Sequence, residues 1–120
     1  MLTAAVRELH LAQPGRFLTD VRTSAEAIWD NNPWITRLSE ESDDVEVIDM
    51  HYPLVHHSNQ RPYHFLHGFV QYLGQRLGIS IPVTQFRGDV FLTDEERQSP
   101  LEDYELPETF WIIVGGGKYV

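Results

Sequence analysis

The stretch YHFLHGFVQYLGQRLG, residues 63–78, carries the clearest structural signal in this chain. Its apolar side chains recur at the three- and four-residue spacing that places them along one face of an α-helix. These side chains are Phe65, Leu66, Phe69, Val70, Leu73 and Leu77. Gly78 follows them in the position where a glycine commonly ends a helix. The stretch therefore predicts a helix with one buried face.

Extended segments are predicted on both sides of this helix. Upstream, VEVID at residues 45–49 predicts a strand, and residues 50–62 predict a long irregular loop. Downstream, ISIPVTQF at 79–86 is extended, and Pro82 indicates an edge strand or an irregular one. DVFL at 89–92 predicts another short strand.

The first thirty residues show the same alternation of helix and strand. Residues 2–12 have an apolar pattern of helical period, and QPG at 13–15 ends it. RFLTDV at 16–21 predicts a short strand. TSAE at 23–26 has the pattern of a capping box, which predicts a short helix ending at Trp29.

The C-terminal part supplies a second capping box and the most apolar run. TDEE at 93–96 predicts a helix start. FWIIV at 110–114 has no polar side chain, which is typical of a strand buried on both faces of a parallel sheet. Because strands and helices alternate, the predicted fold class is α/β with a mostly parallel sheet. The pattern begins with a helix and stops after a glycine loop, so we expect both ends of the domain to be cut.

Composition excludes several classes of protein. The chain has 120 residues and a formal charge of −9, which disfavours a nucleic-acid binder. It has no cysteine, which excludes a disulfide scaffold or a thiolate metal site and fits a reducing cytoplasm. The sequence shows no apolar run long enough to span a membrane and no signal peptide. The acidic clusters at 39–46 and 93–108 are expected to be solvated surfaces.

The run GGGK at 115–118 directly follows the predicted strand 110–114. It is not a Walker A loop, because Ile112 stands where that loop needs a glycine and Tyr119 where it needs Ser or Thr. Glycines still let backbone N–H groups approach an anion, and a lysine adds a positive charge. The run therefore indicates either a phosphate-binding loop or a simple turn.

Five of the six histidines are gathered in one part of the chain. They are His51, His56, His57, His64 and His67. Without an HExxH pattern or a carboxylate at ligand spacing, no metal site is predicted. A polar loop after a strand is suited to hydrogen-bonding a sugar, and surface or packing roles remain the alternative for each histidine.

No catalytic pair of carboxylates can be singled out. Asp20, Asp49 and Asp89 each lie near a predicted strand, and each is expected to cap a helix rather than to act as a base. No GxSxG sequence is present, so serine hydrolysis has no support.

Four stretches together resemble one family. They are MLTAAVRELHLAQPGRFLTDVRT (1–23), WDNNPWIT (29–36), DVEVIDMHYPLVHHSNQRPYHFLHGFVQYLGQRLG (44–78) and FWIIVGGGKYV (110–120). The chain resembles the acceptor-side half of ADP-heptose:lipopolysaccharide heptosyltransferase-like enzymes, which form glycosyltransferase family 9. Those enzymes have the GT-B fold, in which two Rossmann-like halves face each other across a cleft.

The resemblance implies an incomplete enzyme. Residues 1–108 would form the acceptor-side Rossmann-like domain without its first strand, and residues 109–120 the linker and first strand of a missing donor-binding domain. In the family the first strand ends in a Gly-Asp turn, whose aspartate is the proposed general base. That turn is missing here, and GDV at 88–90 lies too far along the chain to replace it. The catalytic residue therefore stays unassigned.

The resemblance also implies two partial binding sites. The donor-phosphate candidates are Gly115, Gly116, Gly117 and Lys118. The acceptor-loop candidates are His51, His56, His57 and Asn59. No cofactor and no metal is expected.

The expected function follows from this resemblance. The chain would be part of a cytoplasmic, inverting glycosyltransferase that moves a sugar such as heptose from a nucleotide sugar to a cell-surface glycan or lipopolysaccharide acceptor. Alone it would be inactive, and a second chain or domain would complete the fold. The alternatives are a non-catalytic α/β module that binds a glycan or a protein, and a truncated reading frame whose product never matures.

Overall fold

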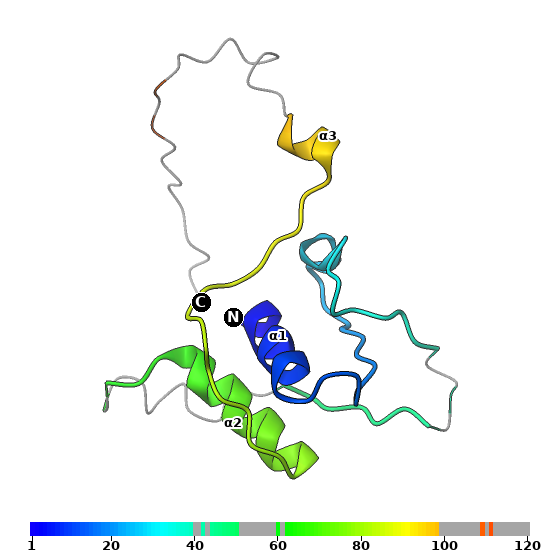
Figure 1. Cartoon of the computed structure of the whole chain (residues 1–120), viewed down its shortest axis with the longest axis vertical. Coiled ribbons are helices and arrows are strands. Elements are labelled where there is room, and N and C mark those ends of the chain that lie inside the picture. The colour runs from blue at the N-terminus through cyan, green and yellow to red at the C-terminus, as the bar shows by residue number, and fades with distance from the viewer. Residues whose placement is uncertain are drawn as a thin grey trace.

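The computed structural model describes residues 1–39, 42, 44–50, 60, 62–98, 109 and 111. Regular structure in this part of the chain consists of three α-helices and one 3₁₀-helix (Figure 1). They are α1 (Leu2–Ala12), η1 (Glu26–Trp29), α2 (Phe65–Leu77) and α3 (Asp94–Arg97).

Helix α1 is the central element of the described structure. Seven consecutive residues, from Thr3 to Leu9, are buried. A helix buried on every side must be covered from several directions, and Figure 1 shows α2 and the extended segments arranged around α1. The helix ends at Gln13, whose backbone N–H donates to Leu9 O at 3.0 Å. The predicted helix at 2–12 and its predicted end are confirmed.

Helix α2 confirms the prediction made from residues 63–78. His64 caps its first turn, since Nδ1 accepts a hydrogen bond from Leu66 N at 3.2 Å. Gly78 ends the helix in the left-handed conformation, with φ of 63°. The backbone N–H groups of Gly78 and Ile79 both donate to Gly74 O, which satisfies a carbonyl at the helix end.

The hydrophobic core lies where α1 packs against α2. Its buried members are Ala4, Ala5, Leu9, Leu66, Phe69, Val70, Leu73 and Ile81. The alanines of α1 let the two helices approach closely, and α2 contributes the large side chains. Ile81 comes from the segment after α2, so that segment is anchored to the helix pair.

The predicted α/β fold with a Rossmann-like, mostly parallel sheet is wrong for the described residues, which contain no β-strand. The segments 16–21, 45–49, 79–86 and 89–92 have no regular secondary structure, and no ladder of backbone hydrogen bonds joins them. Of the predicted strand 110–114, all but Trp111 lies outside the described residues.

Side chains take the place of neighbouring strands along the segment that follows α2. Gln85 N–H donates to Glu8 Oε1 at 3.1 Å, and Asp89 N–H donates to Thr3 Oγ1 at 3.0 Å. Side chains that bond to backbone groups compete with sheet ladders for the same donors and acceptors. The strands predicted from the apolar pattern are therefore wrong, because that pattern does not determine what the backbone groups bond to.

The two predicted capping boxes have different outcomes. At α3, Thr93 Oγ1 accepts from Glu96 N at 3.1 Å, while Glu96 Oε2 accepts from Thr93 N at 2.7 Å, so this box is confirmed. The box predicted at 23–26 is wrong. Thr23 Oγ1 accepts instead from Ala25 N at 3.4 Å, and the turn that follows is the 3₁₀-helix η1.

Candidate functional site

The predicted binding residues lie outside the described part of the chain. The acceptor-loop candidates are His51, His56, His57 and Asn59, and the donor-phosphate candidates are Gly115, Gly116, Gly117 and Lys118. Both assignments stay predictions. The predicted division at residues 108 and 109 also remains untested.

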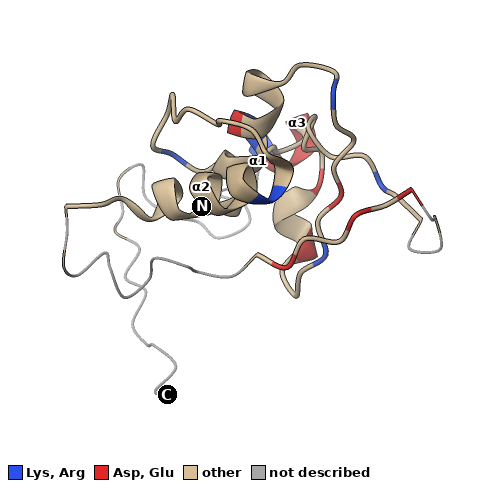
Figure 2. Ribbon diagram, turned by 90° about the horizontal axis from the view of Figure 1, so that it is seen from below, with Lys and Arg blue, Asp and Glu red and all other residues tan. Residues whose placement is uncertain are grey.

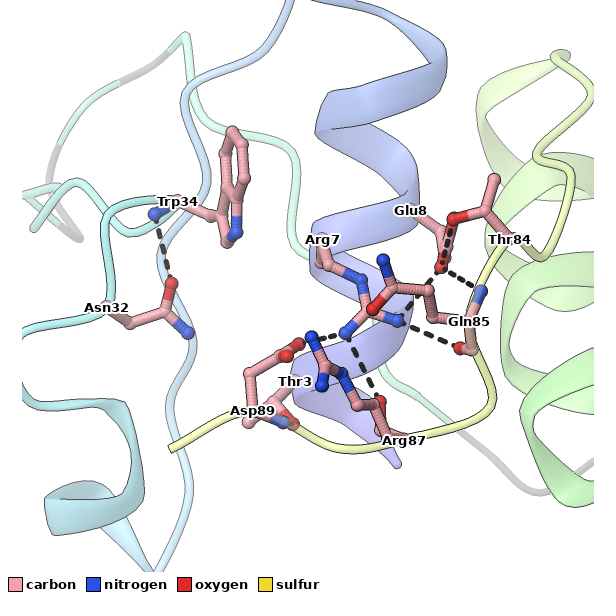
Figure 3. A network of polar contacts seen from close by, with 9 residues as sticks. All are labelled: Thr3, Arg7, Glu8, Asn32, Trp34, Thr84, Gln85, Arg87 and Asp89. Atoms are coloured by element: carbon pink, nitrogen blue, oxygen red, sulfur yellow. Dashed lines mark hydrogen bonds and ion pairs between the residues drawn. The ribbon is translucent and has the colours of Figure 1, made fainter. Parts of the chain in front are cut away.

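The most extensive polar arrangement among the described residues surrounds a buried arginine on α1 (Figure 3). We call it the Arg7 cluster. It consists of Thr3, Arg7, Glu8, Thr84, Gln85, Arg87 and Asp89. Three members lie on α1 and four on the extended segment after α2, so the cluster joins the start of the chain to its last third.

Arg7 is the hub of the cluster. Its Nη1 donates to Arg87 O at 3.2 Å and forms an ion pair with Asp89 Oδ2. Its Nη2 donates to Gln85 O at 2.9 Å and to Glu8 Oε1 at 2.9 Å. Burial alone would lower the pKa of Arg7, but the hydrogen bonds and charges of both carboxylates raise it. Arg7 is therefore held in its charged form.

Glu8 is the most deeply buried charged side chain among the described residues, with 1% of its surface exposed. Its carboxylate accepts from Thr84 Oγ1 at 2.9 Å and from Gln85 N at 3.1 Å. Burial would raise the pKa of Glu8, whereas the hydrogen bonds from Arg7, Thr84 and Gln85 lower it below 4.5. Glu8 is therefore held as a carboxylate and makes a poor proton acceptor.

A second polar group lies beside α1 at the turn after η1. Asn32 Oδ1 accepts from Trp34 N at 3.0 Å, and Asn32 Nδ2 is buried without a partner among the described residues. The Trp34 ring stacks on His10, with 5.6 Å between ring centroids. His10 Nε2 also lies 3.0 Å from Thr19 Oγ1, and burial lowers the pKa of His10. The stacking of Trp34 on His10 fixes this turn against α1.

Asp20 holds two loop segments together rather than capping a helix. Its carboxylate accepts from the backbone N–H of Val21 at 2.9 Å and of Leu38 at 3.1 Å, and it pairs with Arg22 at 2.9 Å. Burial would raise its pKa, but the backbone hydrogen bonds and the two neighbouring arginines, Arg22 and Arg37, lower it. Asp20 is therefore a structural anion.

The prediction that Asp20, Asp49 and Asp89 cap helices is wrong. The caps of the described helices are Met1, Ala25, His64 and Thr93. Asp89 pairs with Arg7, and Asp49 is an exposed residue of the 44–50 segment.

His64 and His67 face the same way, as their spacing suggested, but they face an aromatic ring. The Phe86 ring lies edge-on to both, at centroid distances of 5.0 Å and 5.2 Å. No group of three His, Asp or Glu side chains suited to a metal ion occurs within the described ranges. These two histidines therefore serve packing and capping.

The arrangement has clear chemical limits. In the Arg7 cluster, Glu8 and Asp89 are both paired with Arg7. Outside the cluster, Asp20 is paired with Arg22. Basic residues are distributed over several of the described segments (Figure 2). Among the described residues, the buried carboxylates are therefore suited to holding segments in place and not to general base catalysis.

Sequence reasoning missed the Arg7 cluster, although one signal was present. Arg7 and Glu8 lie in the middle of an apolar helix with buried residues before and after them. Adjacent charges of opposite sign inside such a helix indicate a buried ion pair, because a lone buried charge is strongly unfavourable. The partners Thr84, Gln85 and Asp89 had no such signal.

Comparisons with protein-family models, curated proteins and solved structures found no match to this chain. In the part of the chain that the structure describes, no helix has the length and apolar character needed to cross a bilayer. The family resemblance therefore depends on the four quoted stretches alone.

Proposed function

We propose that this chain is the acceptor-side part of an inverting glycosyltransferase and that it does not transfer sugar alone. One observation carries the proposal. The described parts of three stretches that resemble the family, within 1–23, 29–36 and 44–78, pack on one another. Helix α1 packs against α2, and His10 stacks on Trp34.

The proposed reaction needs a general base. A base removes the proton of the acceptor hydroxyl as its oxygen attacks the anomeric carbon, and the nucleotide diphosphate leaves with the bonding electrons. Glu8, Asp20 and Asp89 are each paired with an arginine, so none of these three carboxylates is proposed as the base. The inactivity of the chain alone is part of the proposal that comes from the resemblance.

The remaining parts of the proposal come from the resemblance. The donor is a nucleotide sugar, the acceptor is a cell-surface glycan or lipopolysaccharide, and heptose is the candidate sugar. The location is the cytoplasm. No cofactor is required.

The proposal is tested by donor binding to the purified chain. We expect ADP-heptose to bind weakly and saturably in calorimetry, with no transfer product. Lys118 is the only lysine of the chain, so Lys118→Ala should weaken binding about tenfold. Arg16→Ala, which removes the same charge from an exposed side chain, is the matched control. No saturation by any nucleotide sugar at millimolar concentration would contradict the proposal.

A second candidate function is a non-catalytic module that binds a protein. The observation in its favour is the number of large apolar side chains exposed on segments outside the helices. They include Leu18, Val47, Phe86, Val90, Leu92 and Trp111. Three of them, Phe86, Val90 and Leu92, lie on one short segment, where exposed apolar side chains can form an interaction site.

A further inference from the structure

The extended segment at residues 84–92 has two backbone edges, and they differ in the described structure. In an extended chain the N–H and C=O of one residue point to the same edge, and those of the next residue point to the opposite edge. Odd- and even-numbered residues therefore present their backbone groups in opposite directions. From Gln85 to Phe91 the hydrogen bonds follow that division, whereas at the two ends the backbone of Thr84 bonds to Glu8 and Leu92 O accepts from Arg97 Nε at 3.3 Å.

The odd-numbered edge is occupied. Side chains of α1 bond to the N–H and C=O of Gln85, the C=O of Arg87 and the N–H of Asp89. Asn31 Nδ2 lies 3.5 Å from Phe91 O and extends this row. The odd edge faces α1, as Figure 3 shows for Gln85, Arg87 and Asp89.

Between Gln85 and Phe91 the even-numbered edge is open within the described residues. No hydrogen bond there involves the backbone of Phe86, Gly88 or Val90. We call these three residues the open edge. Phe86 is 53% exposed and Val90 is 64% exposed. Unpaired backbone groups in a row form a template for another extended chain.

We propose that the open edge binds an extended segment of a partner protein, which adds to it as a β-strand. Main-chain hydrogen bonds to Phe86, Gly88 and Val90 would supply the affinity, and exposed apolar side chains beside them the contact area. Because side chains already bond to the odd-numbered edge, a partner strand can add only at the open edge.

The acidic residues next to the open edge favour a basic partner strand. Asp94, Glu95 and Glu96 form the first turn of α3, directly after this segment. A partner strand that alternates apolar and basic side chains complements this acidic end. A second copy of the chain is disfavoured as occupant, because each copy carries a formal charge of −9. This proposal does not depend on sugar transfer.

The experiment uses the full chain and a fluorescent peptide, acetyl-KVKVKVK-amide. We expect saturable binding by anisotropy and slower amide exchange at Phe86, Gly88 and Val90 by NMR. The matched control peptide has the same charge but an N-methyl group on every lysine and valine backbone nitrogen, which removes the N–H donors of both backbone edges and prevents strand pairing. An acidic peptide, acetyl-EVEVEVE-amide, tests the charge argument. Both are expected to bind at least about tenfold more weakly.

A substitution at Val90 tests the position of the contact. Val90→Pro removes one N–H of the open edge without removing any hydrogen bond described above, and the extended chain accommodates a proline. It should weaken peptide binding about tenfold, while Val90→Thr, which keeps the N–H, should stay within about twofold.

Three outcomes would overturn the proposal. They are equal binding of the N-methylated peptide, peptide protection at amides away from the open edge, and self-association of the chain through this edge. If Val90→Pro does not fold, amide exchange in the unsubstituted chain still tests the proposal. The proposal requires that the peptide protect the amides of Phe86, Gly88 and Val90.

Discussion

Arg7 and Asp89, which are 82 residues apart in the sequence, form an ion pair beside α1. The same arginine also bonds to the backbone of Gln85 and Arg87. One side chain therefore holds the extended segment against the first helix. Because the Arg7 side chain is only 8% exposed, its charge depends on these partners instead of water.

Arg7→Met should be the most destabilising charge substitution in the described structure. It leaves Glu8 and Asp89 without their shared cation, and breaking a buried pair costs about 3–5 kcal/mol. Chemical denaturation measures this change in the free energy of unfolding. Arg22→Met is the control, because that side chain is half-exposed and its pair with Asp20 should contribute less than about 1 kcal/mol. Equal effects would show that Arg7 is not the hub.

Glu8 should make the chain sensitive to acid. Its pKa in the folded state is lowered below 4.5, so the folded state binds this proton less readily than the unfolded state. The stability that Glu8 contributes is present above pH 4.5 and is lost as pH falls through the lowered pKa. Glu8→Gln should flatten the stability profile in that window, as measured by urea unfolding at several pH values. A steep loss that persists in Glu8→Gln would assign it to other carboxylates.

As pH falls, His10 should contribute a separate loss of stability that begins at a higher pH than the loss due to Glu8. Burial lowers its pKa below 6.5, so the unfolded state takes up this proton first as pH falls. Stability should therefore begin to decline below about pH 6.5. His10→Phe keeps a ring against Trp34 and should remove that part of the decline. NMR titration of the His10 ring in the folded chain gives the pKa directly, and a value above 6.5 would contradict the prediction.

Leu66→Ala should test the contact between α1 and α2. Leu66 is fully buried in the core, and removing such a side chain costs about 2–5 kcal/mol. Leu11→Ala is the same chemical change at a side chain that is 46% exposed, so it should cost much less. Thermal or urea unfolding of both variants makes the comparison. Similar losses would mean that the helix pair is not the stabilising core.

Gly74→Ala should destabilise the end of α2, although alanine is the better helix former. An added Cβ would lie 2.6 Å from Ile79 O, and a backbone atom cannot easily move away. The clash should therefore exceed the gain of about 1 kcal/mol in helix propensity. Gln75→Ala, at the exposed neighbouring position, is the control and should be neutral or slightly stabilising. Increased stability of Gly74→Ala would show that the turn at Gly78 rearranges.

The two long helices could be predicted because their signals are local. The stripe in α2, the stop after residue 12 and the glycine at 78 depend on neighbours within a few residues. The capping box at Thr93 is also local and is confirmed. The box at Thr23 failed although its residues fit the pattern, since the chain after it forms only the 3₁₀-turn η1.

The sheet was predicted wrongly because pairing is not a local property. The sequence patterns at 79–86 and 89–92 favour an extended backbone, but they do not determine which groups that backbone bonds to. In the structure, Glu8 and Thr3 accept the donors of Gln85 and Asp89 that a neighbouring strand would have used. The Arg7 cluster was missed for the same reason, since Thr84 and Asp89 are ordinary polar residues until the fold brings them to α1.

The sequence by itself determined where α1 and α2 lie and which face of α2 is apolar. Those properties follow from spacings of three to five residues, over which backbone geometry is fixed. The tertiary structure alone decided that Arg7 and Glu8 are buried and that one edge of residues 85–91 is occupied. Both depend on contacts between residues about 80 positions apart, and only the folded chain brings such groups within hydrogen-bonding distance.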